Sequence, residues 1–162
     1  MPLFWYQTLC TFFCMKIDPF PNSRFEQILV TCISYFKDRT KKIILSPDAP
    51  AAIGPYSQAV EVNGMVFVSG QIALSVFESG ASIEEETNQV MKNIGHILKA
   101  AGCTYTDVVK CSIFVKDMDN FAKINQVYGA YFPENPPARE TVEVARLPKD
   151  VRVEIACIAY KS

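Results

Sequence analysis

The segment from Pro137 to Ala159 constrains the fold more than any other part of the chain, because it holds two strand patterns with a turn between them. In the first arm, strand alternation places Val142 on one face and Arg139 and Thr141 on the other. Residues 147–150 supply the proline and aspartate that turns favour. These patterns predict a β-hairpin over residues 137–159.

The second arm of this hairpin is apolar on one face, and Glu154 lies on the opposite face. The alternation therefore sets both Arg139 and Glu154 apart from the core. A guanidinium is a planar fork that matches a carboxylate, and a nearby glutamate can hold and polarise a water. The alternative is that both are ordinary charges on a solvated sheet face. The apolar positions are Val151, Val153, Ile155, Cys157 and Ala159.

Two more strand signals precede this segment. The dipeptide Asn63-Gly64 separates strand patterns at residues 59–62 and 65–69, and this dipeptide favours a two-residue hairpin turn. Residues 108–115 form an apolar run of strand length. We therefore expect a second hairpin and one further strand before the final segment.

Two amphipathic helices are expected between these strands. Ser82 followed by Glu85 is a capping box, which predicts a helix over residues 83–101 that ends at Gly102. A second helical pattern follows Asp119, a residue suited to capping, and Pro133 stops it. The resulting order of elements predicts an α+β fold in which both helices cover one face of a mixed sheet.

The other face of the sheet also needs a cover. Phe67 and Val115 belong to strands that are partly apolar on both sides, and large exposed apolar patches usually mark association. We therefore expect a homo-oligomer with its open sheet faces turned inward, which would place Arg139 and Glu154 near a seam between subunits.

Composition excludes several classes of function. A net charge of −1 at pH 7 gives no electrostatic case for binding nucleic acid or an anionic membrane. His96 is the only histidine, and the six cysteines include no CxxC pair, so a zinc site of ordinary spacing is not expected. With 162 residues, one domain is the natural expectation.

Residues 1–40 differ in composition from the rest. The first apolar run is too short to span a bilayer, which takes about 20 residues. It lacks a positive region before it and a clear cleavage site after it, as a signal peptide would have. We interpret residues 1–40 as an appended or misassigned extension, ahead of a targeting segment and, third, a membrane anchor.

Three blocks of the remaining chain resemble one family. GPYSQAV at 54–60, VFVSGQI at 66–72 and PARETVEVARLPKDVRVEI at 137–155 are similar to the RidA (YjgF) family of reactive-intermediate imine deaminases. The resemblance covers residues 41–162 and implies a chorismate-mutase-like α+β fold and a homotrimer with ligand pockets between subunits. It also implies hydrolysis of 2-imino acids, such as 2-iminopropanoate and 2-iminobutanoate, to 2-keto acids and ammonia, with no cofactor or metal.

The resemblance assigns roles residue by residue. Arg139 matches the arginine that clamps the substrate carboxylate, and Glu154 matches the glutamate associated with the attacking water. Glu140 departs from the family pattern, which has a small or uncharged residue there, but strand alternation aims it away from Arg139. The loop at residues 73–82 is shorter than usual. The substrate-binding matches are Tyr56, Ser69, Gly70, Asn125 and Thr141.

Three other functions remain open, the last of them a chaperone-like holdase that exposes apolar surface, for which only the N-terminal segment offers support. The same pocket could capture a small carboxylate without turning it over, as a binding module. An endoribonuclease that inhibits translation is the third candidate, although the acidic balance and the single histidine argue against it. We expect a cytoplasmic location, with the mitochondrion as the second candidate, and no membrane or nucleic-acid partner.

Overall fold

The strands form one mixed sheet in the computed structural model, which describes residues 40–161. Their spatial order is β1-β2-β3-β6-β4-β5. The β4 and β5 strands run parallel, and the other neighbours are antiparallel. The strands are β1 (Lys42–Ile44), β2 (Ala59–Val62), β3 (Met65–Gln71), β4 (Val108–Val115), β5 (Ala138–Glu143) and β6 (Val153–Tyr160).

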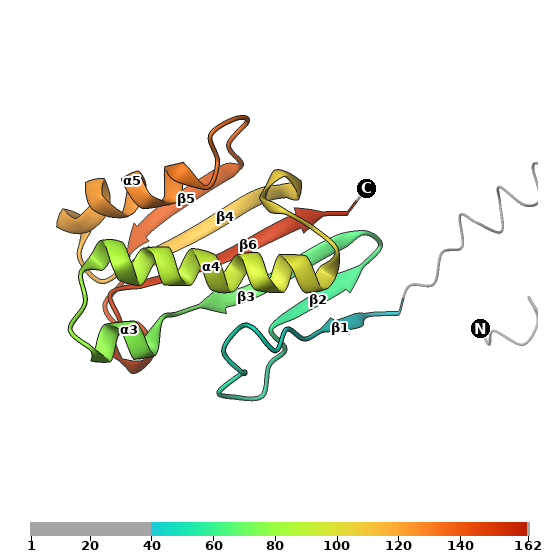
Figure 1. The fold of residues 1–162 in the computed structure, drawn as a ribbon, viewed down its shortest axis with the longest axis horizontal. Coiled ribbons are helices and arrows are strands. Elements are labelled where there is room, and N and C mark those ends of the chain that lie inside the picture. Colours follow the sequence, from blue (N-terminus) through green and yellow to red (C-terminus); the bar gives the residue numbers. More distant parts are fainter. Residues whose placement is uncertain (1–39, 162) are drawn as a thin grey trace, which may run out of the picture. The chain divides into compact units, whose positions relative to one another are not determined.

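The two longer helices, α4 (Ile83–Ala101) and α5 (Phe121–Ala130), cover one face of this sheet, as predicted (Figure 1). The core lies between them and the strands, with Ile94, Ile113 and Ile155 among its fully buried side chains. Burial of these apolar faces is the main favourable term that holds the layers together. The remaining helical segments are α3 (Leu74–Glu78) and the 3₁₀ turns η1 (Tyr105–Asp107), η2 (Met118–Asn120) and η3 (Pro148–Asp150).

The predicted ends of α4 are confirmed. The Ser82 hydroxyl accepts a hydrogen bond from the backbone N of Glu85 (3.2 Å), and the Glu85 carboxylate accepts one from the backbone N of Ser82 (2.9 Å). These bonds lower the pKa of Glu85. Gly102 ends the helix with a φ of 77°, a left-handed conformation that glycine adopts without strain.

The predicted hairpin over residues 137–159 is wrong. The β5 strand pairs with β4 in parallel, with Thr141 beside Ile113, and β6 lies between β3 and β4. The physical reason is the different polarity of the two strands. Ala156 and Ile158 make β6 apolar on both faces, as suits a central strand, whereas charged residues make β5 suitable for an edge.

Smaller differences concern local elements. The hairpin at Asn63-Gly64 and the strand at residues 108–115 are confirmed, and both turn residues have positive φ. Asp119 does not cap α5, because a 3₁₀ turn precedes the helix and Asp117 accepts the hydrogen bond from the backbone N of Asp119. The short elements β1 and α3 were not predicted.

The face of the sheet that the helices leave uncovered is rich in apolar side chains. Val142 is one of them, although the predicted hairpin had placed it toward the core. Ile43, Phe67, Val142 and Tyr160 are each more than 40% exposed there. Exposure of this kind agrees with the expectation that the open face needs a cover.

Candidate active site

Glu154 lies in a hollow on the open face of the sheet. Strand alternation in β6 turns Val153 and Ile155 into the core and Glu154 outward, where it is half-buried. The hollow has a volume of about 290 Å³. Burial raises the pKa of the Glu154 carboxyl above its ordinary value, which moves this group toward the range of an acid–base catalyst. The lining residues are Ile53, Tyr56, Ser69, Gly70, Ile72, Pro148 and Glu154.

Gly70 forms the floor under the Glu154 carboxylate. A Cβ atom at Gly70 would lie 1.8 Å from Oε1 of Glu154, so the carboxylate occupies the space that any other residue would fill. The pairing of β3 with β6 shifts register between Val68 and Gln71, and such bulges are common beside active sites. The chain therefore brings the backbone at Gly70 directly against the Glu154 carboxylate.

Ser69 and Tyr56 shape the rim of the same hollow. The Ser69 hydroxyl donates a hydrogen bond to the backbone O of Ser57 (2.7 Å) and so holds the 50–57 loop beside β3. Tyr56 is 46% exposed, and its hydroxyl accepts a hydrogen bond from the backbone N of Ile53 (3.3 Å). Because the phenol accepts this bond, its own O–H remains able to donate to a bound molecule.

Arg139 lies on the helix side of the edge strand β5. Its Nη1 donates to Oδ1 of Asn125 (2.6 Å), and its guanidinium carbon lies 5.0 Å from the ring centroid of Tyr128 and 5.8 Å from that of Phe121. Arg139 is exposed, and no carboxylate within residues 40–161 lies at ion-pair distance from it. The remaining N–H groups of this cation are therefore available to an anion.

The predicted site residues thus fall into two groups on opposite faces of the sheet. Asn125 and Thr141 accompany Arg139 on the helix side, whereas Tyr56, Ser69 and Gly70 accompany Glu154 on the open side. The expectation that one hairpin would present Arg139 and Glu154 together is wrong, because β4 separates β5 from β6 and register sends their side chains to different faces. A single chain does not assemble the whole constellation.

Glu140, which departs from the family pattern, and Thr141, a predicted substrate-binding residue, follow Arg139 in β5. Glu140 points to the face opposite Arg139, as expected, and pairs there with Lys110 (3.0 Å) and hydrogen-bonds with Ser112. The pKa of Glu140 is lowered by these partners, first by Ser112. Thr141 lies on the same face of β5 as Arg139, and its hydroxyl is buried with no hydrogen-bond partner within residues 40–161, while its role in substrate binding stays a prediction.

Sequence reasoning missed the apolar lining and the aromatic support. Ile53, Ile72 and Pro148 complete the hollow around Glu154, and nothing in their local sequence distinguishes them. Phe121 and Tyr128, which flank Arg139, carried a signal, because their spacing from Asn125 places all three on one face of α5.

The geometry defines a class of protein: a small α+β domain with helices on one sheet face and a carboxylate hollow on the other. Residues 46–161 match the family described as Endoribonuclease L-PSP, so the chain belongs to this family, the RidA family, and the predicted resemblance is confirmed. No helix within residues 40–161 is long and apolar enough to cross a membrane, and no group of three His, Cys, Asp or Glu side chains there could hold a metal ion.

Two relatives and one solved structure illustrate the similarity. A RutC family protein of Synechocystis is 50% identical over 125 residues, which cover 74% of this chain and 96% of the relative. The 2-iminobutanoate/2-iminopropanoate deaminase of Mus musculus is 46% identical over 125 residues, with 75% and 92% covered. The crystal structure of TdcF from E. coli with bound serine superposes with a TM-score of 0.69 at 42% identity, covering 75% of this chain and 99% of that one.

Proposed function

We propose that this protein hydrolyses 2-imino acids, such as 2-iminopropanoate and 2-iminobutanoate, to 2-keto acids and ammonia. The observation that carries the proposal is the pair of half-sites: a half-buried carboxylate, Glu154, over Gly70 in a small hollow, and an exposed cation, Arg139, without a carboxylate partner. The similarity to the 2-iminobutanoate/2-iminopropanoate deaminase of Mus musculus supports this proposal.

The two half-sites meet when Arg139 of one copy reaches the Glu154 hollow of the next. The apolar open face, with Phe67 and Val142 exposed, supports self-association, and a ring of three identical chains would create three equivalent sites. We therefore propose a homotrimer with its sites at the seams between subunits.

The chemistry then follows from the residues. Arg139 binds the substrate carboxylate through paired N–H groups, each charge-assisted bond contributing about 1.5–3 kcal/mol. Glu154 takes a proton from a water molecule while the oxygen of that water bonds to the imine carbon of the substrate. Glu154 returns this proton to the nitrogen, which gives a carbinolamine. Glu154 then takes the hydroxyl proton of the carbinolamine and passes it to the same nitrogen as the C–N bond breaks, so that ammonia leaves and the keto group forms. Tyr56 and the backbone at Gly70 position the intermediate.

The decisive assay couples a serine or threonine dehydratase, which releases the enamine and imine, to keto-acid formation. Addition of this protein should raise the rate of keto-acid and ammonia release. Arg139→Ala should abolish the increase while far-UV circular dichroism stays unchanged, and Arg146→Ala, which removes an exposed arginine paired with Asp150, is the matched control. Full activity of Arg139→Ala would exclude the proposed site.

A non-catalytic carboxylate-binding function is the second candidate. The TdcF structure carries a bound serine, which has a carboxylate of the size that this hollow admits. Binding without release of ammonia in the coupled assay would favour this alternative over the deaminase.

The cytoplasm remains our proposed location. A relative in Arabidopsis thaliana is named chloroplastic, so members of this family also occur in organelles. The N-terminal extension, residues 1–40, is the part of this chain in which we considered a targeting signal, and all of it except Thr40 lies outside the described residues. Its boundary at residue 40 stays a prediction.

A further inference from the structure

The strongest unexplained polar feature is a carboxylate sealed inside the protein. Glu86 lies in the first turn of α4, and its side chain is 0% exposed. Burying a charge is costly unless it is paired and hydrogen-bonded. Both oxygens of Glu86 are in fact satisfied by one residue, Arg152: Oε1 accepts from its backbone N (2.9 Å) and Oε2 from its Nε (2.7 Å).

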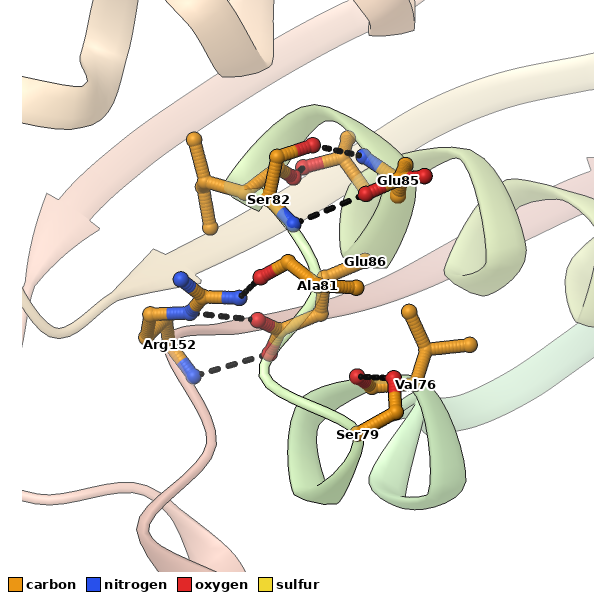
Figure 2. A network of polar contacts seen from close by, with 9 residues as sticks. Val76, Ser79, Ala81, Ser82, Glu85, Glu86 and Arg152 are labelled. Atoms are coloured by element: carbon orange, nitrogen blue, oxygen red, sulfur yellow. Dashed lines mark hydrogen bonds and ion pairs between the residues drawn. The ribbon is translucent and has the colours of Figure 1, made fainter.

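The same guanidinium also holds the neighbouring segments. Nη2 of Arg152 donates to the backbone O of Ala81 (2.6 Å), in the loop before α4. Its guanidinium carbon lies 5.7 Å from the ring centroid of Phe77 in α3. Figure 2 shows the nitrogens of Arg152 reaching toward Ala81 and Glu86, with the capping box of Ser82 and Glu85 close by. We call the Glu86–Arg152–Ala81 contacts the arginine clamp.

The arginine clamp is joined through the chain to two walls of the Glu154 hollow. Arg152 is two residues before Glu154 and four after Pro148, so the clamp fixes the start of the strand that carries the carboxylate. On the other side, the wall residue Ile72 leads directly into α3, whose Phe77 packs against Arg152. The backbone O of Arg152 also accepts from the backbone N of Lys116 (3.0 Å), which ties the clamp to β4.

We propose that Arg152 and Glu86 are positioning residues, which hold the Glu154 carboxylate at its working place over Gly70. This inference rests on the proposed function. A small displacement of the Glu154 carboxylate would slow the chemical step much more than it would weaken substrate binding. Substrate binding depends on Arg139, which lies in a different strand, β5. Loss of the clamp therefore acts on kcat and leaves KM close to its original value.

The test uses Arg152→Lys in the full-length protein. Lysine keeps the backbone N–H bond to Glu86 and still neutralises this carboxylate, so the fold is retained. Its single amino group cannot bond to Glu86, reach the backbone O of Ala81 and cover the Phe77 ring at the same time, as the guanidinium does. We expect kcat on 2-iminopropanoate to fall about tenfold, with KM changed less than about twofold. Glu86→Gln should likewise lower kcat about tenfold and change KM less than about twofold. The control Arg146→Lys, in an exposed pair with Asp150, should leave both constants unchanged.

Amide hydrogen exchange provides a readout that does not depend on turnover. In Arg152→Lys, exchange should accelerate in residues 147–154 and 72–81 while the β2–β3 hairpin keeps its protection. A variant with unchanged kcat and unchanged exchange, or one whose only change is a lower Tm, overturns the inference. If the wild-type protein releases no ammonia, the proposed function fails, and the exchange measurement alone then decides whether the clamp orders the hollow.

Discussion

At the level of single residues, the position of the Glu154 carboxylate depends on Gly70 having no side chain. Because a Cβ atom at Gly70 would meet Oε1 of Glu154 at 1.8 Å, Gly70→Ala must push the carboxylate or the strand away. We expect kcat/KM on 2-iminopropanoate to fall about 100-fold, the scale that a misplacement of about 1 Å can produce. The coupled dehydratase assay measures this loss.

Gly129→Ala is the matched control for this substitution. Gly129 is exposed in α5, and nothing lies within 4 Å of the Cβ atom it would gain. The variant should keep its activity and gain about 0.5–1 kcal/mol in stability, as alanine replaces glycine in a helix. Equal activity losses at the two glycines would contradict the role assigned to Gly70.

The raised pKa of Glu154 makes a second prediction at this scale. The carboxylate must be ionised to act on water, so kcat/KM should fall as pH drops through a value above the ordinary 4.5 of a glutamate. The effect of pH on stability has the opposite direction. Burial penalises the charged carboxylate, so Glu154 lowers the free energy of unfolding at pH values above its raised pKa, and this penalty disappears as pH falls and the carboxylate is protonated. Glu154→Gln should therefore be inactive yet have the higher Tm at pH 7, which scanning calorimetry across pH tests.

At the level of elements, the first turn of α4 depends on its capping box. Ser82→Ala removes the bond to the backbone N of Glu85 and leaves that donor without its partner. The expected loss is about 1 kcal/mol in the free energy of unfolding, which urea titration measures. An unchanged urea midpoint would mean that packing of α4 against the sheet alone fixes its start.

The elements that were predicted correctly carry their signals locally. Ser82, Glu85 and Gly102 define α4 within the helix itself, and Asn63-Gly64 defines the β2–β3 turn, so the neighbouring residues suffice. The short helix α3 has Ala73 at its N-cap and no side-chain cap, so its sequence carries no local signal for a helix start. Local chemistry thus predicted most helices and strands.

Strand partners could not be predicted in the same way, because they depend on contacts distant in sequence. Residues 137–159 fit a hairpin locally, and only competition among all strands moves β6 between β3 and β4. The polarity of β5 and the apolar residues on both faces of β6 were available signals for edge and centre. The resemblance identified Arg139 and Glu154 individually, but register decides which faces they occupy.

At the level of the whole molecule, a site shared between copies predicts complementation. Arg139→Ala and Glu154→Gln chains should each be inactive alone. When the two are refolded together as mixed trimers, some seams join an intact Arg139 to an intact Glu154, and about a quarter of wild-type activity should return at equal mixing. Refolding each variant by itself is the control. A mixture that stays inactive would contradict a site assembled from two chains.

The position of β6 has a consequence for biosynthesis. Among the strands of residues 40–161, β6 comes last in the sequence, yet it pairs with both β3 and β4 at the centre of the sheet. During synthesis, β3 and β4 leave the ribosome before β6, so the two halves of the sheet lack their common neighbour until β6 has been made. Folding must then close contacts of long sequence separation, which is slow, and the nascent chain exposes unpaired strand edges until β6 pairs with them. Removal of residues 153–162 would delete the strand that β3 and β4 share as a pairing partner, together with Glu154.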